Sequence, residues 1–114
     1  MSGQPEEAFK VVDASEWAAA QLSGGYEGSA VDLADGYIHL STADQLVETV
    51  RKHYAGRQDL LLLTVDLNGL GRTLVWEPSR GGALFPHIYG PLPVAAVTAT
   101  RAFSVGADGA MAFA

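Results

Sequence analysis

Hydrophobic and polar positions in the N-terminal part of the chain predict one strand, one helix and a long loop. Residues 8–12 form a short run of β-branched and aromatic character, which is typical of a strand. Asp13 fits a helix cap, and the helix-favouring residues that follow it end at Gly24. Residues 23–36 contain four glycines and three acids, so we expect a loop there.

The segment 35–42 predicts a strand that runs directly into a second helix. Side chains alternate between the two faces of a strand, so Tyr37, His39 and Ser41 share one face while the apolar residues between them face the core. Thr42 fits the cap of the helix, in which apolar residues then recur at helical spacing. His39 therefore lies close to a helix N-terminus, where backbone N–H groups favour anionic groups such as phosphate.

Strand patterns dominate the later part of the chain. The continuous apolar run 60–66 predicts a central strand that is buried on both faces. Residues 72–77 and 97–105 alternate as half-buried strands do, which places Trp76 and Glu77 on opposite faces. Because the helices come early and the strands late, the order of elements favours the α+β class.

Residues 76–93 hold four of the five prolines of the chain. Proline lacks a backbone donor, so this composition suits a shaped loop better than a helix or a central strand. We expect such a loop to hold Glu77, Arg80, His87 and Tyr89 around a pocket, since binding groups often lie on loops fixed by a scaffold. The alternative is a rigid connection in which the aromatic residues merely pack.

Length and charge narrow the function classes. The 114 residues fit one domain, which we place at residues 8–105 with two short helices and with flexible tails at residues 1–7 and 106–114. A net charge of −6 argues against nucleic acid as a partner. The absence of cysteine excludes disulfides and thiol chemistry. No apolar run has the length of a membrane helix, so we expect a cytoplasmic protein without a membrane partner.

Two arrangements of the polar residues give hydrolytic or metal chemistry. His39, His87 and Glu77 are the residue types of a two-histidine, one-carboxylate metal triad, although their spacing is no known local signature. Ser41 with a histidine base would give a hydrolytic site, but no nucleophile-elbow sequence surrounds Ser41, which the helix start already explains.

A third arrangement is a nucleotide pocket. The N-terminus of the second helix and Arg80 would meet phosphate, and Trp76 or Tyr89 would stack on a ring. His39 and His87 would hydrogen-bond to sugar or amide groups. The chain has no Rossmann fingerprint and no phosphate loop, so the hypothesis rests on the convergence of these side chains.

Two long motifs carry a resemblance to a known family. They are Asp35-Gly36-Tyr37-Ile38-His39-Leu40-Ser41-Thr42 and, after Trp76-Glu77 and Ser79-Arg80-Gly81-Gly82, the run Phe85-Pro86-His87-Ile88-Tyr89-Gly90-Pro91-Leu92. Over residues 8–103 the chain resembles domain-of-unknown-function family 952, a small bacterial family. That family resembles the ADP-ribosyltransferase fold, and the first motif is similar to the histidine-containing motif of the RNA 2′-phosphotransferases.

The resemblance implies bent, split β-sheets around a cleft that holds NAD in active relatives. It implies ADP-ribosyl transfer or NAD glycohydrolase-like cleavage, with a non-enzymatic small-ligand-binding or interaction module as the alternative. Active transferases carry a histidine or arginine on the first strand, where this chain has Phe9-Lys10-Val11. The catalytic candidates are His39, Glu77 and His87, and the cofactor-binding candidates are Tyr37, Ser41, Thr42, Trp76, Arg80 and Tyr89.

Overall fold

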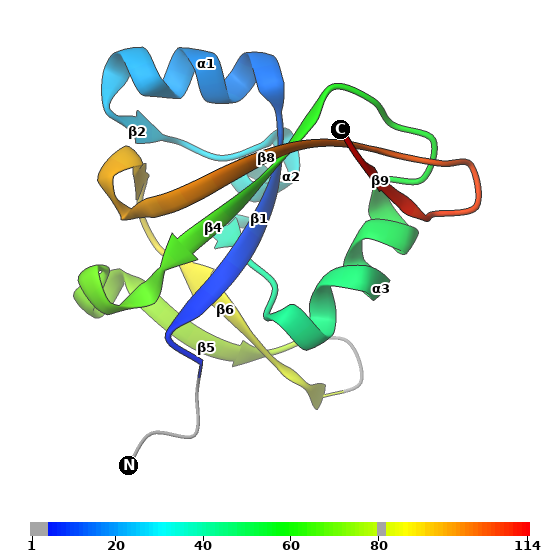
Figure 1. The fold of residues 1–114 in the computed structure, drawn as a ribbon. Coiled ribbons are helices and arrows are strands. Elements are labelled where there is room, and N and C mark those ends of the chain that lie inside the picture. Colours follow the sequence, from blue (N-terminus) through cyan, green and yellow to red (C-terminus); the bar gives the residue numbers. More distant parts are fainter. Residues whose placement is uncertain (1–4, 80–81) are drawn as a thin grey trace.

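A computed structural model describes residues 5–79 and 82–114, which form nine strands and three α-helices (Figure 1). The helices are α1 (Ala14–Ser23), α2 (Ala30–Asp35) and α3 (Ala43–His53). The strands are β1 (Glu7–Asp13), β2 (Gly25–Tyr26), β3 (Ile38–His39), β4 (Leu60–Asp66), β5 (Leu74–Pro78), β6 (Leu84–Ile88), β7 (Leu92–Pro93), β8 (Val97–Val105) and β9 (Met111–Phe113). Within these residues no helix has the length and apolar character needed to cross a membrane.

The described strands form three antiparallel sheets, which confirms the α+β class. Their orders are β1-β4-β8-β9, β3-β6-β5 and β2-β7. β4 is central, as its apolar run predicts, and each of its faces carries a hydrophobic cluster. Leu63 and Val65 belong to a cluster with α1, whereas Leu60 belongs to a cluster with α3. Burial along the strand is incomplete, however, because Leu61 and Leu62 keep part of their surface exposed.

Two of the three helices follow the sequence prediction, and α2 does not. α1 ends at Gly24, whose φ of +93° is a conformation that glycine adopts without strain. The segment expected to be a loop contains α2, because Ser29 and Asp32 cap its start. The Ser29 hydroxyl accepts from the Asp32 N–H, and the Asp32 carboxylate accepts from the Ser29 N–H.

Residues 76–93 are wrongly predicted as a loop, since β6 is the central strand of its sheet and contains Pro86. The Pro86 carbonyl accepts from the Leu40 N–H at 3.0 Å. In an antiparallel ladder the N–H and C=O of one residue point to the same neighbour, so the donor that Pro86 lacks falls on the β3 side. β3 ends at His39, and Ser41 pairs instead with Phe9 of β1 through two hydrogen bonds of 2.7 and 2.9 Å.

The C-terminal residues are more ordered than the expected tail. β9 pairs with β8, and Phe113 stacks on Phe103 with ring centroids 5.4 Å apart. Figure 1 shows α1 lying over β2 at one end of the molecule and α3 beside β9 at another. β1 passes between these helices, and its side chains belong to the hydrophobic clusters of both.

Candidate functional site

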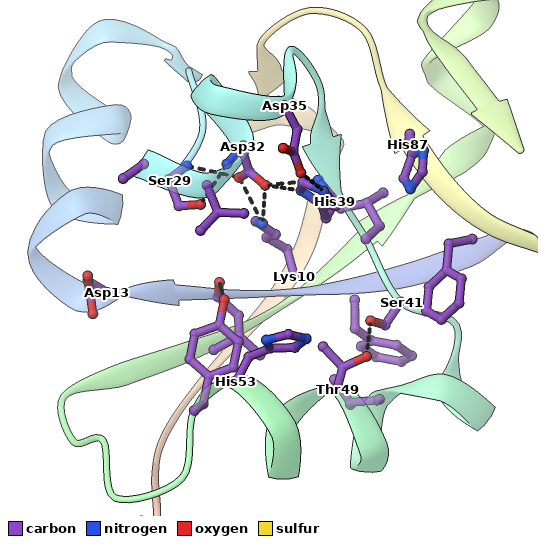
Figure 2. A pocket seen from close by; sticks show the side chains of 18 of the residues that line it. Lys10, Asp13, Ser29, Asp32, Asp35, His39, Ser41, Thr49, His53 and His87 are labelled. Carbon is purple, nitrogen blue, oxygen red and sulfur yellow. Dashed lines mark hydrogen bonds and ion pairs between the residues drawn. The ribbon is translucent and has the colours of Figure 1, made fainter. Parts of the chain in front are cut away.

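A cavity of 610 Å³ lies where β1, α2, β3 and α3 meet the end of β6 (Figure 2). This volume is within the usual range for small-molecule pockets. α3 contributes one helical face, formed by Leu46, Thr49 and His53. β6 contributes Phe85 and His87. The cavity therefore draws its walls from segments that are far apart in the sequence.

A buried ion pair forms one wall of the cavity. Lys10 of β1 places Nζ 2.8 Å from Oδ2 and 3.2 Å from Oδ1 of Asp32 in α2, and the two side chains are 5% and 2% exposed. Charged side chains are rarely buried so completely unless they are paired. Burial lowers the pKa of Lys10, and the neighbouring Asp32 opposes this only in part.

His39 contacts the same carboxylate from the other side, as Figure 2 shows. Its Nδ1 lies 2.6 Å from Oδ1 of Asp32, and its Nε2 lies 2.9 Å from Oδ2 of Asp35. Carboxylates only accept hydrogen bonds, whereas a neutral imidazole donates from one nitrogen. Both contacts are therefore satisfied together by the imidazolium form.

Asp32 is the electrostatic centre of this wall. Burial alone would raise its pKa, but the hydrogen bond from His39 and the charge and hydrogen bond of Lys10 outweigh burial and hold the pKa well below its ordinary value. Its carboxylate also accepts from the backbone N–H groups of Ser29 and His39. Asp32 thus ties β1, α2 and β3 together.

His87 forms a second histidine–carboxylate pair on the cavity. Its Nδ1 lies 2.7 Å from Oε1 of Glu77, and the hydroxyl of Tyr89 donates to the same oxygen at 2.7 Å. The hydrogen bonds from His87 and Tyr89 lower the pKa of Glu77, and the bond to Glu77 raises the pKa of Tyr89 to about 12. Tyr37 stacks on the His87 ring with centroids 4.1 Å apart.

The structure brings several of the predicted site residues together. His39 and His87 are paired in register between β3 and β6, and their ring centroids are 5.5 Å apart. Ser41 also lines the cavity, where its hydroxyl donates to Thr49 at 3.1 Å. The Tyr37 ring contacts the rings of both histidines, and the Tyr89 ring lies 5.2 Å from that of Tyr37.

Other predicted site residues lie elsewhere. Thr42 is not among the described lining residues, and its N–H is bonded to the Gln45 side chain at the start of α3. The face of α3, rather than its N-terminus, meets the cavity. Trp76 packs against the core on the opposite face of β5 from Glu77, so it offers no ring to a ligand in the cavity. Arg80 lies outside the described residues.

The metal alternative finds no support in the geometry. The described residues contain no group of three or more His, Cys, Asp or Glu side chains placed to hold a metal ion. His39 and His87 each turn Nδ1 toward a carboxylate of their own, so the two histidines and Glu77 do not converge on one point.

Sequence reasoning missed Lys10, Asp32 and Asp35 as parts of the site. Lys10 lies between Ala8 and Val12 on the core-facing side of β1, and a charged residue at a core position of an alternating strand was the available signal. Asp32 had its signal in the spacing Ser29 to Asp32, which fits a helix start. Asp35 gave no signal apart from its place as the first residue of the first motif.

The fold and its cavity define a small α+β domain whose cavity is lined by two histidines, each paired with a carboxylate. The chain belongs to the family described as Protein of unknown function (DUF952), whose model matches residues 11–100. Its structure is similar to the crystal structure of protein CC0527 from Caulobacter crescentus, with a TM-score of 0.88 and 48% identity over 93% of each chain. The solution NMR structure of CC0527 has a TM-score of 0.79 and 48% identity, covering 92% of this chain and 90% of that one. No curated protein matches the chain.

Proposed function

We propose that the cavity binds a nucleotide of the NAD or ADP-ribose type and that the protein transfers or hydrolyses the ADP-ribosyl group. The observation that carries the proposal is that two histidines, each paired with a carboxylate, line one cavity of 610 Å³. The resemblance of the family to the ADP-ribosyltransferase fold supports this choice of ligand.

The charge of the lining suits the oxidised nicotinamide end of NAD. Asp13, Glu16, Asp32 and Asp35 all line the cavity. Asp13 is paired with Arg57 at 2.6 Å, and Asp32 with Lys10. Cleavage breaks the bond between the ribose C1′ and the pyridinium nitrogen, whose electron pair leaves with neutral nicotinamide. Carboxylates favour the positive charge that develops on the sugar carbon in such a step.

The test is calorimetric titration of the protein with NAD and with ADP-ribose, followed by chromatography for released nicotinamide. We expect binding of NAD by the wild type and a clear loss of affinity in His87→Ala. Lys52→Ala is the matched control, because Lys52 is an exposed residue that pairs with Glu48 on the surface of α3. That variant should bind as the wild type does.

The outcomes separate the alternatives. An absence of heat at millimolar NAD and ADP-ribose would defeat the nucleotide proposal. Binding without nicotinamide release, with or without a protein or RNA acceptor, would leave a non-enzymatic ligand-binding module. Binding that survives His87→Ala unchanged would place the ligand outside this cavity.

A further inference from the structure

Glu77 lies behind His87 rather than on the cavity surface, so it does not stabilise a charge on a bound ligand directly. Glu77 is not among the described residues that line the cavity, whereas His87, to which it is bonded, does line it. A carboxylate placed behind a histidine acts through that histidine, as the acid of a serine-protease triad does. Glu77 therefore reaches a ligand in the cavity only through His87.

The geometry around His87 fixes which of its nitrogens a ligand can meet. Glu77 only accepts hydrogen bonds, so Nδ1 of His87 carries the proton that is donated at 2.7 Å. In the neutral ring the lone pair is then on Nε2. Tyr37 stacks on the ring at 4.1 Å with the planes inclined by 28°, which restricts rotation out of this position. His87 is 4% exposed, so the packing around it also resists a ring flip.

Tyr89 fixes the carboxylate in turn. Its hydroxyl donates at 2.7 Å to Oε1 of Glu77, the same oxygen that accepts from His87. This bond orients Glu77 and leaves its charge in place, because a phenol is neutral at physiological pH. The three side chains form a chain that runs from the partly exposed Tyr89 to the cavity.

We infer that His87 is the proton acceptor of the cavity, using Nε2, and that Glu77 and Tyr89 are positioning residues that set its tautomer. The assignment rests on the proposed function for its substrate, a hydroxyl group or water that attacks C1′ of the bound nucleotide. As the oxygen bonds to C1′ and the C1′–N bond breaks, the proton of the oxygen passes to Nε2. The electron pair of the broken bond leaves with nicotinamide, and the Nδ1–H bond to Glu77 stabilises the imidazolium that forms.

The inference has a test that needs no nucleotide. Long-range proton–nitrogen NMR spectra of 15N-labelled protein report the tautomer of each histidine, and His87→Gln assigns the signals. We expect neutral His87 to carry its proton on Nδ1 in the wild type and in Glu77→Gln, whose amide oxygen still accepts. In Glu77→Ala the proton should move to Nε2, and in Tyr89→Phe the Nδ1 form should be retained with weaker preference. A proton on Nε2 in the wild type would overturn the inference.

A kinetic readout distinguishes positioning from a purely structural role. p-Nitrophenyl acetate serves as the probe, since a neutral imidazole nitrogen attacks its carbonyl carbon and displaces p-nitrophenolate. Water then hydrolyses the acetyl-imidazole to acetate and regenerates the imidazole. We expect His87→Gln and Glu77→Ala to lower the protein-catalysed rate by about a hundredfold, the low end of what a positioned acid–base group contributes. Glu77→Gln should restore part of the rate, and Lys52→Ala should leave it unchanged.

The two proposals fail separately. If NAD gives no heat but the tautomer and ester rates behave as stated, the nucleotide proposal falls and the assignment of His87 stands. If NAD is bound and cleaved while His87→Gln and Glu77→Ala keep the wild-type ester rate and the wild-type kcat for nicotinamide release, the assignment of His87 falls and the nucleotide proposal stands.

Discussion

Single residues in this protein matter through the partners that surround them. Asp32 accepts from Lys10, His39 and Ser29, and all of these bonds are built on one nearly inaccessible carboxylate. A buried charge is costly unless it is paired, so each of these bonds offsets part of the free-energy cost of burying the Asp32 carboxylate. Gly28 makes the arrangement fit, because a Cβ there would lie 2.8 Å from the Cβ of Asp32.

The lowered pKa of Asp32 predicts how the free energy of unfolding falls in acid. Its pKa in the folded protein lies below the ordinary value of 3.8, so the unfolded chain binds the proton more readily. The stabilisation is present above about pH 4 and is lost as the pH falls towards the folded-state pKa, by at most about 1.4 kcal/mol per pH unit for one group. Urea unfolding between pH 2 and 7 should show a steeper acid decline in the wild type than in Asp32→Asn.

The comparison holds even if Asp32→Asn is less stable at every pH. The slope below pH 4, rather than the absolute free energy, is the quantity that the pKa of Asp32 controls. If the free energy of unfolding falls with the same slope in both proteins, carboxylates other than Asp32 cause the loss of stability in acid.

At the scale of elements, local signals predicted most of the helices and strands. Capping signals located α1 and α3, and the apolar run located β4. α2 was missed because its cap lies in a glycine-rich segment and its box ends in Asp32 rather than Glu or Gln. β6 was missed because Pro86 argues against a central strand, and only the tertiary position of β3 shows that the missing donor is not needed.

The central position of β4 gives the element-scale prediction. Leu63 is fully buried between β1 and β8, so Leu63→Ala should lower the free energy of unfolding by about 2–5 kcal/mol. Leu62→Ala should cost less, because Leu62 is only partly buried against the α3 cluster. Urea denaturation of both variants checks the order. A larger loss for Leu62→Ala would contradict the packing of this strand.

At the scale of the whole molecule, the cavity depends on contacts that no local pattern contains. His39 and His87 could be predicted to meet because each lies in a distinctive motif, and their registered pairing shows how β3 and β6 bring them together. The pair Lys10–Asp32 joins residues 22 positions apart, and neither residue is in a motif. Trp76 was predicted to stack on a ligand ring. Strand alternation already put it on the opposite face from Glu77, and it packs against the core.

Although the protein is acidic, its cavity is lined by groups of both charges. The net charge of −6 is that of the whole chain, whereas the cavity collects Lys10, Arg57 and three histidines among its carboxylates. A ligand with both a pyridinium ring and phosphates can therefore meet groups of either sign. ADP-ribose lacks the pyridinium cation, so we expect it to bind more weakly than NAD.

The most direct measurement is a crystal structure of the protein grown with NAD at saturating concentration. We expect density for the nucleotide, or for its ADP-ribose product, inside the cavity between β1, α2, α3 and β6, with the ribose next to His87. Density at another place on the surface, or an unoccupied cavity in protein that binds NAD in solution, would contradict it.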